Sequence, residues 1–469
     1  MGPKLRKIIG MLVALTPLMV ATDAMSSSLS FPKSFKWCVA TSAHQIEGDN
    51  RDSDWWAFEH TPGNIKDGKP SGLAADHWNR LEEDTALLSA LNVDQYRFSI
   101  EWAKIEPRPG EWNSEAIEHY RRELALLAQA SIEPIITLHH FTLPKWVADR
   151  GGLEWDGFPE AFAKFSARAF NEIGEGVRDW VTINEPQTIL AAGYIEGIHP
   201  PKKRDLKNIH LPTRGMIRAH ALAYHRLHEI ARARGQTIRV GMAHHLRVFQ
   251  AASRWNPLDH WAAGILEQLG NWAIPDAITT GKLKINIPFT LNYSENIPEA
   301  ANTQDYIGVN YYSRDLIRFN PAAPGFIQRL VKNGASVSDL GWEIYPKGLY
   351  RVLRSVSKHY PGKQILILEN GIADHRDDLR GKFLVDHLRW LKRALDERIP
   401  VENYCHWSLL DNYEWHEGFE PRFGLYEVDY STFERTLRPS GRLFAEIARD
   451  ARIPTSKNWT RVGHSRLGQ

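Results

Sequence analysis

The 469-residue chain is poor in cysteine, the residue that builds disulfide frameworks and many structural zinc sites. Its two cysteines, Cys38 and Cys405, are too few for a disulfide framework, and no cysteine–histidine spacing resembles a structural zinc site. Both lie in predicted strands, which are neighbours if they are the first and last strands of a closed barrel. Because free cysteine is commonly buried, we expect two buried free thiols.

An excess of charge of either sign is also absent. The chain has 58 Lys and Arg residues and 56 Asp and Glu residues, for a formal net charge of +2. This balance gives no reason to expect a nucleic-acid partner or an anionic surface. The content of 43% hydrophobic and 24% charged residues is ordinary for a soluble globular enzyme.

Long apolar runs are scarce, and the clearest one lies within residues 1–24. Three basic residues precede an apolar stretch that ends in Thr-Asp-Ala, which is the order of a secretory signal peptide. The stretch is short and contains Thr16-Pro17, so we expect no membrane span and no membrane partner. Alternatively, Met25 is the true start of the protein. The first interpretation implies a secreted or periplasmic protein and the second a cytoplasmic one.

Strand-like apolar runs alternate with amphipathic helical stretches along the rest of the chain. Helical spacing is found, for example, at 78–91, 114–129, 158–174, 213–234 and 382–397. The eight strand-like runs are 37–41, 95–102, 134–140, 180–184, 239–246, 306–311, 364–368 and 403–410.

This alternation predicts parallel strands, and eight such units predict a single (β/α)₈ TIM barrel with extended βα loops. No Gly/Ser-rich linker divides the chain. We therefore predict one barrel domain over residues 25–455, with 249–302 as its longest insertion and 456–469 as a polar surface tail.

Two glutamates stand where apolar strands give way to loops. Glu185 follows Asp-Trp-Val-Thr-Ile-Asn and precedes Pro186, and Glu369 follows Gln-Ile-Leu-Ile-Leu and precedes Asn370-Gly371. Barrel enzymes carry catalytic groups at the C-terminal ends of their strands. Two such carboxylates on separate strands predict acid–base and nucleophilic chemistry at a glycosidic bond.

A series of motifs runs along the chain, at 31–48, 96–102, 137–141, 184–186, 308–312, 341–346, 369–371, 407–415 and 422–430. In sequence and in order these motifs resemble those of glycoside hydrolase family 1, the β-glucosidase family. The similarity covers about nine-tenths of the chain, and the whole series is far more specific than Asn-Glu-Pro alone.

The resemblance implies a retaining exo-acting β-glycosidase and, within that class, favours a β-glucosidase. Glu185 then corresponds to the acid/base and Glu369 to the nucleophile, with the carboxyl groups about 5 to 5.5 Å apart. Arg97, Asn310 and Tyr312 match the residues that surround this pair. The expected substrate is a small β-glycoside or oligosaccharide, and no metal or organic cofactor is implied because two carboxylates and a water suffice.

The family's sugar-binding positions are also filled. Asn184 matches the residue that holds the 2-hydroxyl. Glu414 and Gln45 match those that hold the 4-hydroxyl, and the residue matched by Glu414 also reaches the 6-hydroxyl. Trp342 matches the aromatic residue on the leaving-group side. The complete set of substrate-binding candidates is Gln45, His140, Asn184, Trp342, Trp407, Glu414 and Trp415.

Two branches of the family are disfavoured by single residues. Branches that act on 6-phosphorylated glycosides carry serine where this chain has Glu414, and a carboxylate repels phosphate. We therefore expect a non-phosphorylated glycoside. The branch that uses external ascorbate as base carries glutamine in place of Glu185.

Some residues depart from the family pattern. Phe141 stands where tryptophan is usual, which removes an indole N–H donor, and His44 replaces a common aromatic residue. Both are close enough to the sugar site by motif position to alter sugar preference. Cys38, Leu153 and Leu368 also differ from the common residues.

Two other functions remain open at this stage. A transglycosidase uses the same two glutamates but lets an alcohol or sugar intercept the covalent intermediate. A non-catalytic sugar-binding barrel is the second alternative, although such relatives lose one or both glutamates. The aglycone, the glycone preference and the oligomeric state do not follow from the sequence.

Overall fold

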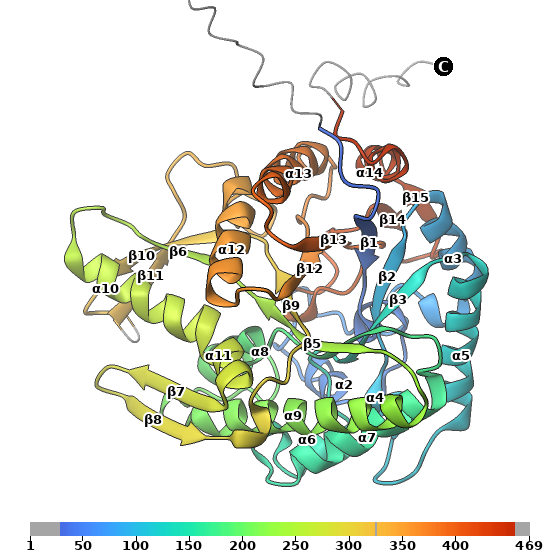
Figure 1. Ribbon diagram of the computed structural model, residues 1–469, viewed down its shortest axis with the longest axis horizontal. Helices are drawn as coiled ribbons and strands as arrows, with labels where there is room; N and C mark the ends of the chain where they lie inside the picture. The colour runs from blue at the N-terminus through green and yellow to red at the C-terminus, as the bar shows by residue number, and fades with distance from the viewer. Residues whose placement is uncertain (1–28, 324–325, 455–469) are drawn as a thin grey trace, which may run out of the picture.

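The computed structural model describes residues 29–323 and 326–454, and its centre is a closed barrel of eight parallel strands (Figure 1). Around the barrel the order is β1-β13-β12-β9-β5-β4-β3-β2, and β2 pairs with β1 to close it. The predicted TIM barrel is therefore confirmed, and all eight predicted strands form it. The strands are β1 (Lys36–Ala40), β2 (Gln95–Ser99), β3 (Glu133–His139), β4 (Asp179–Asn184), β5 (Arg239–His245), β9 (Tyr306–Asn310), β12 (Gln364–Asn370) and β13 (Val401–Trp407).

Long helices lie outside the strands and cover the barrel (Figure 1). They present apolar residues to it at helical spacing, which buries one face of each helix. These helices are α3 (Leu81–Ala90), α5 (Ser114–Gln129), α7 (Phe158–Ile173), α9 (His210–Ala233), α12 (Pro346–His359), α13 (Arg380–Asp396) and α14 (Pro439–Asp450).

Shorter helices lie in the βα loops and in the longest insertion. They are α1 (Ala43–Ile46), α2 (Asp54–Glu59), α4 (Trp102–Ile105), α6 (Lys145–Ala148), α8 (Pro186–Thr188), α10 (Pro257–Leu266) and α11 (Ala273–Thr280). π-helical turns, Ile189–Glu196 and Glu267–Trp272, follow α8 and α10.

The remaining strands form small sheets on the loops. β6 (Val248–Ala251) pairs with β10 (Arg314–Phe319), which also pairs with β11 (Ile327–Leu330). A hairpin of β7 (Lys282–Ile287) and β8 (Leu291–Asn296) extends from the insertion (Figure 1). β14 (Tyr426–Val428) pairs with β15 (Arg435–Leu437).

The second and last strands end earlier than the apolar runs predicted. The run 95–102 stops being a strand at Ser99, because the Glu101 side chain accepts a hydrogen bond from the Ala103 backbone N–H and starts α4. The run 403–410 begins earlier, at Val401, and ends at Trp407.

The core has two layers, as the alternation of side chains along barrel strands requires. On β1, Trp37 and Val39 face the outer helices, whereas Cys38 and Ala40 belong to a cluster inside the barrel. The outer layer is the larger of the two and contains most of the apolar side chains of the helices.

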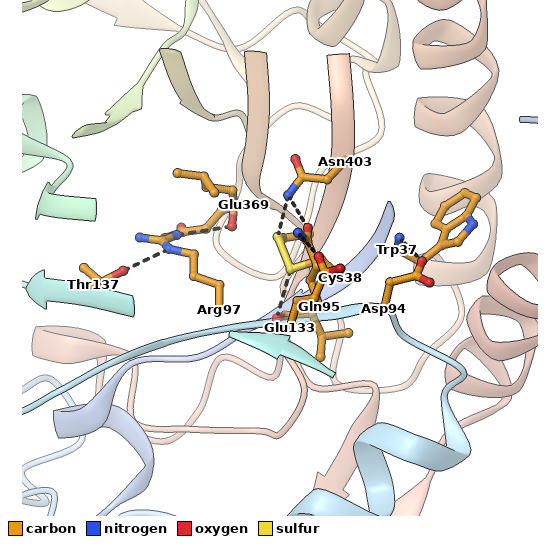
Figure 2. Close-up of a disulfide and its surroundings, with 12 residues drawn as sticks. Trp37, Cys38, Asp94, Gln95, Arg97, Glu133, Thr137, Glu369 and Asn403 are labelled. Carbon is orange, nitrogen blue, oxygen red and sulfur yellow. Dashed lines mark hydrogen bonds and ion pairs between the residues drawn. A yellow bond between two sulfur atoms is a disulfide. The ribbon is translucent and has the colours of Figure 1, made fainter. Parts of the chain in front are cut away.

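The expectation of two free thiols is wrong, because Cys38 and Cys405 form a disulfide (Figure 2). β1 and β13 are adjacent and parallel, and their register places these two residues directly opposite each other inside the barrel. Their Cα atoms are 4.1 Å apart, although 367 positions separate them in sequence. The register of strand pairing, which composition does not reveal, brings the two thiols together.

Among residues 29–323 and 326–454, no helix combines the length and the apolar character needed to cross a membrane. The segments 1–24 and 456–469, for which we predict a signal peptide or a late start and a surface tail, lie outside the described residues.

Candidate active site

The predicted site residues gather at the C-terminal ends of the barrel strands. Arg97 lies in β2, Asn184 ends β4, Asn310 ends β9, and Glu369 is the penultimate residue of β12. The others follow the strands in their loops, apart from Trp407, which ends β13. These are Gln45, His140, Glu185, Tyr312, Trp342, Glu414 and Trp415.

Irregularities in β4 and β12 explain why Asn184 and Glu369 face the barrel axis. Val181 belongs to the inner cluster, but Ile183, two positions on, belongs to the outer one, and the pairing of β4 with β5 shifts between Val181 and Asn184. β12 shifts in the same way after Ile367. Such bulges re-aim side chains that simple alternation would point the other way.

Glu185 takes an unusual backbone conformation where its strand ends. Its φ is 44° and its ψ is 60°, in the left-handed region, which non-glycine residues rarely adopt. Pro186 then opens α8, and the Glu185 backbone N–H donates to the Ala243 carbonyl at 2.8 Å. Pro186 and the hydrogen bond to Ala243 thus fix the backbone of Glu185 in this strained conformation. Strained backbone conformations of this kind cluster at functional sites.

Glu369 is held by one cation and one hydroxyl. Arg97 Nη1 lies 2.5 Å from Glu369 Oε1, and the Tyr312 hydroxyl donates to Oε2 at 2.6 Å. Figure 2 shows Arg97 extending toward Glu369, with Thr137 on the other side of its guanidinium. Arg97 is fully buried and Glu369 is 3% exposed. Both contacts favour the ionised form of this carboxyl group.

Glu185 has amide, hydroxyl and imidazole neighbours. Asn310 Nδ2 donates to Glu185 Oε1 at 2.9 Å. On the other oxygen, the Thr188 hydroxyl donates at 2.7 Å and His245 Nδ1 lies 3.1 Å away. No Arg or Lys side chain is paired with Glu185 in the described part of the chain. The two glutamates therefore lie in different environments.

Burial and charge act on both carboxyl groups. Burial raises the pKa of Glu369 to about 7, with a further rise from the charge of Glu185 and an opposing effect of Arg97. Burial also raises the pKa of Glu185, but a charged His245, together with the hydrogen bonds of His245, Thr188 and Asn310, outweighs it and lowers the pKa to about 2. Which of the two glutamates has the higher pKa therefore depends on whether His245 is charged. The two carboxyl groups are also coupled, because protonating Glu185 removes the negative charge that raises the pKa of Glu369.

Asn184 links Arg97, the partner of Glu369, to Asn310, the partner of Glu185. Its Oδ1 accepts from Arg97 Nη2 at 2.6 Å and from Asn310 Nδ2 at 3.1 Å. Its Nδ2 lies 3.0 Å from His140 Nε2. Burial lowers the pKa of His140 well below its usual value, so this imidazole is neutral and can accept from Asn184.

Aromatic rings form one wall beside His140. The His140 ring stacks at 5.8 Å from Trp407 and 6.0 Å from Trp415. Phe141 packs on Trp415 at 4.9 Å, and the His44 ring stacks on the same indole at 5.5 Å. Both unusual residues thus touch a predicted sugar-binding residue.

Gln45 and Glu414 form a separate polar pair. Gln45 Nε2 donates to Glu414 Oε2 at 3.4 Å and to the Tyr413 carbonyl at 2.9 Å. Burial, with the charges of Glu369 and other carboxylates, raises the pKa of Glu414 to about 8. Glu414 directly precedes Trp415, whose ring stacks on that of His140, so this pair lies beside the same centre.

Trp342 lies on the Tyr312 side, with its ring 5.6 Å from that of Tyr312. Its ring is 6.3 Å from that of Phe423, a member of the cluster inside the barrel against which Trp342 packs. All twelve predicted residues thus belong to one region. Within the described ranges, no group of three or more His, Cys, Asp and Glu side chains could hold a metal ion.

Sequence reasoning missed Thr188, His245 and Arg247. His245 ends β5, Arg247 follows two residues later, and Thr188 ends α8. The available signal was a pair of polar residues, His244-His245, at the end of an apolar strand, which is the position that pointed to the two glutamates. The contact between Glu185 and His245 needs β4 and β5 to be neighbours, as they are.

Comparison with known proteins places the chain among glycosidases. The model of glycosyl hydrolase family 1 matches residues 27–453. Beta-glucosidase A of Thermotoga maritima is 33% identical over 442 residues, covering 90% of this chain and 98% of that protein. Beta-glucosidase A of Acetivibrio thermocellus is 33% identical over 450 residues, covering 90% and 99%.

Solved structures agree with the family model. A beta-glycosidase from Pyrococcus horikoshii has a TM-score of 0.84 and 35% identity, covering 94% of this chain and 100% of that one. The beta-glucosidase from Thermotoga maritima in complex with deoxynojirimycin has a TM-score of 0.85 and 31% identity, covering 91% and 100%. The chain belongs to glycosyl hydrolase family 1 and is an O-glycosyl hydrolase.

Proposed function

We propose that the protein hydrolyses terminal, non-phosphorylated β-D-glucosides with retention of configuration. The observation that carries the proposal is the pair of buried carboxyl groups with unlike surroundings. Glu369 contacts Arg97 and Tyr312, whereas Glu185 contacts an amide, a hydroxyl and an imidazole. Different environments assign different roles to two carboxyl groups in one site.

In the first step Glu369 attacks the anomeric carbon and Glu185 gives its proton to the departing glycosidic oxygen. The carbon–oxygen bond to the aglycone breaks as the Glu369–sugar ester forms. In the second step a water molecule attacks the same carbon, Glu185 takes its proton, and the ester bond breaks. Two inversions at one carbon retain its configuration.

We assign sugar recognition to the polar and aromatic residues around the pair. Asn184, fixed by Arg97 and Asn310, is oriented to bind the 2-hydroxyl, whose hydrogen bonds strengthen in the transition state. Trp407 and Trp415 offer flat apolar surfaces to the pyranose ring.

Gln45 and Glu414 are assigned to the 4-hydroxyl. With its pKa raised to about 8, Glu414 is largely protonated at neutral pH. Because Glu414 is also assigned to the 6-hydroxyl, a phosphate group on that hydroxyl would meet no positive charge from Glu414 or Gln45. Selection against 6-phosphorylated sugars therefore follows from the missing cation, and repulsion is added at higher pH, where Glu414 is ionised.

The direct test is to trap the intermediate. The chain from Met25 onward is incubated with dinitrophenyl 2-deoxy-2-fluoro-β-glucoside, which forms the glycosyl-enzyme quickly and releases it slowly. We expect the mass of one fluorosugar on the peptide that contains Glu369. Glu369→Gln is the control and should remain unlabelled.

Turnover of nitrophenyl β-glucoside, β-galactoside, β-fucoside and 6-phospho-β-glucoside, measured in parallel, ranks the sugars. We expect the glucoside to have the highest kcat/KM and the 6-phosphoglucoside the lowest. Folded protein that turns over none of them and carries no label would contradict the proposed function.

A further inference from the structure

His245 bridges the proposed acid/base and a cation. Its Nδ1 lies 3.1 Å from Glu185 Oε2 and 2.9 Å from the Thr188 hydroxyl oxygen. On the other side of the ring, Arg247 Nε donates to His245 Nε2 at 3.1 Å. The imidazole is 10% exposed and Glu185 is 7% exposed, so these contacts are largely shielded from water.

The direction of the Arg247 hydrogen bond determines where the imidazole proton is. A guanidinium has N–H donors and no acceptor, so Nε2 of His245 must accept and cannot carry a hydrogen. The remaining hydrogen is then on Nδ1, from which it is donated to Glu185 or Thr188. This arrangement is that of a neutral imidazole, because an imidazolium would direct an N–H at the Arg247 N–H.

Arg247 is fixed in this position by the loop that follows β5. Its Nη1 pairs with Asp315 Oδ2 at 3.1 Å. Its backbone N–H donates to Asn271 Oδ1 at 3.0 Å, and Asn271 Nδ2 donates to its carbonyl at 2.8 Å. Asn271 is 2% exposed. The ion pair with Asp315 satisfies Arg247 and keeps its Nε directed at His245.

Other groups around His245 are consistent with a neutral ring. The phenol of Tyr312, beyond β9, meets the imidazole edge-on at 5.8 Å between ring centres. Asp315 on β10 is nearby but is paired with Arg247. Glu185 is therefore the carboxylate that contacts the imidazole directly, and Arg247 is the cation that contacts it.

We propose that Arg247 is a positioning residue that keeps His245 neutral, so that the proton needed for leaving-group departure resides on Glu185. The inference rests on the proposed function, in which Glu185 is the acid. If Arg247 were absent, His245 could take a second proton and form an ion pair with Glu185, leaving the carboxylate unable to protonate the glycosidic oxygen.

The electrostatics of Glu185 support this inference. Burial raises the pKa of Glu185, and the charge on His245 is the largest of the effects that lower it to about 2. A neutral His245 removes that effect, so the pKa of Glu185 rises toward the range in which a general acid works. The ordering of the two glutamates then fits their proposed roles.

The experiment is the pH dependence of kcat/KM for cellobiose, followed by glucose release, in the wild type and Arg247→Leu. Because cellobiose has a poor leaving group, its alkaline limb reports loss of the Glu185 proton. We expect the limb in Arg247→Leu to move about one pH unit lower, with about tenfold lower kcat/KM at pH 7, the size of effect expected of a charge within about 4–6 Å.

Three controls separate this effect from general damage. Arg247→Lys retains a cation and a donor and should recover part of the shift. In the His245→Gln background, adding Arg247→Leu should move the limb no further, because no imidazole is left to charge. With dinitrophenyl β-glucoside, whose leaving group needs no proton, the limb of Arg247→Leu should match that of the wild type.

An unchanged alkaline limb in Arg247→Leu, or the same shift in the presence and absence of His245, would overturn the inference. A loss that is equal for cellobiose and the dinitrophenyl glucoside would also overturn it, because it would indicate a structural role. Failure of the proposed function is distinct, since the wild type would then turn over neither substrate.

Discussion

At the scale of single residues, the site depends on polar side chains that each serve more than one neighbour. Arg97 contacts Glu369, Asn184, Thr137 and the Leu368 carbonyl from one buried guanidinium. Removing it would leave several buried acceptors unpaired, which costs more than any single contact contributes. Substitutions at the edge of this network are therefore more informative than substitutions at its centre.

Tyr312→Phe tests the hydrogen bond to the proposed nucleophile. The hydroxyl stabilises ionised Glu369, so its removal raises the pKa of Glu369. The reaction needs ionised Glu369, so the acid limb of kcat/KM should move to higher pH, by about half a unit to one unit. Tyr311→Phe is the matched control, because the Tyr311 hydroxyl donates to the Tyr345 carbonyl. An acid limb that moves equally in both variants would contradict the assignment.

At the scale of elements, strand ends and tight backbone contacts bring the site together. β12 and β13 are in parallel contact, and the residue after Asn370 must lie against the end of β13. A Cβ atom on Gly371 would lie 1.9 Å from the Trp407 carbonyl oxygen. Glycine is required there because of this close approach, which explains the third residue of Glu-Asn-Gly.

Gly371→Ala should therefore push apart the strand ends that carry Glu369 and Trp407. We expect a loss of about 2 kcal/mol in the free energy of unfolding. We also expect kcat to fall about a hundredfold, because small misplacements of reacting groups are costly. Chemical denaturation and kinetics on nitrophenyl β-glucoside measure both.

The control is Gly264→Ala in α10, where an added Cβ would meet no atom within 4 Å. This variant should be as stable as the wild type or slightly more stable, since alanine is the better helix former. If the two substitutions have equal effects, the close contact at Gly371 does not matter.

At the scale of the whole molecule, the disulfide joins the first and last strands of the barrel. It encloses most of the chain, so it restricts the unfolded state strongly. Reduction should lower the free energy of unfolding by about 3 kcal/mol and lower Tm by several degrees. A Cys38→Ala/Cys405→Ala variant should show no further change with reductant.

Thiol titration in denaturant gives the decisive result for the disulfide. Two reactive thiols per chain before reduction would contradict it. Disulfides persist mainly in oxidising compartments. A protein isolated from its source without free thiols would thus favour export over a start at Met25.

A buried ion network outside the barrel strands predicts how stability varies with pH. His77 Nδ1 lies 2.7 Å from Asp84 Oδ2, and Arg435 Nε lies 2.8 Å from Asp84 Oδ1. Burial disfavours the imidazolium, but hydrogen bonds and the charges of Asp84 and Glu123 outweigh it and raise the pKa of His77 to about 10.

Because the pKa of His77 is higher in the folded state, its stabilisation is complete below the unfolded value of 6.5 and disappears as pH rises toward 10. We expect His77→Gln to be about 3 kcal/mol less stable than the wild type at pH 6. Between pH 6.5 and 10 the variant should lose less of its free energy of unfolding than the wild type does. Urea titrations at several pH values test this. His60→Gln, at a 43% exposed side chain, should behave like the wild type.

Local sequence patterns predicted the number and chain order of the barrel strands, the bounds of five of the long helices to within three residues, and the strand-end positions of Glu185 and Glu369. These features follow from local periodicity and from the polar residue that ends each apolar run. β-Strands and helices of a barrel alternate regularly, so local pattern and global fold agree.

Which strand ends meet depends on tertiary packing. The Cys38–Cys405 disulfide depends on the register of β1 with β13, and the Glu185–His245–Arg247 chain depends on β5 lying beside β4. The inward direction of Asn184 depends on an irregularity in β4 that breaks simple alternation. Each is a contact between segments distant in sequence, and such contacts are fixed by the packing of the closed barrel rather than by local preference.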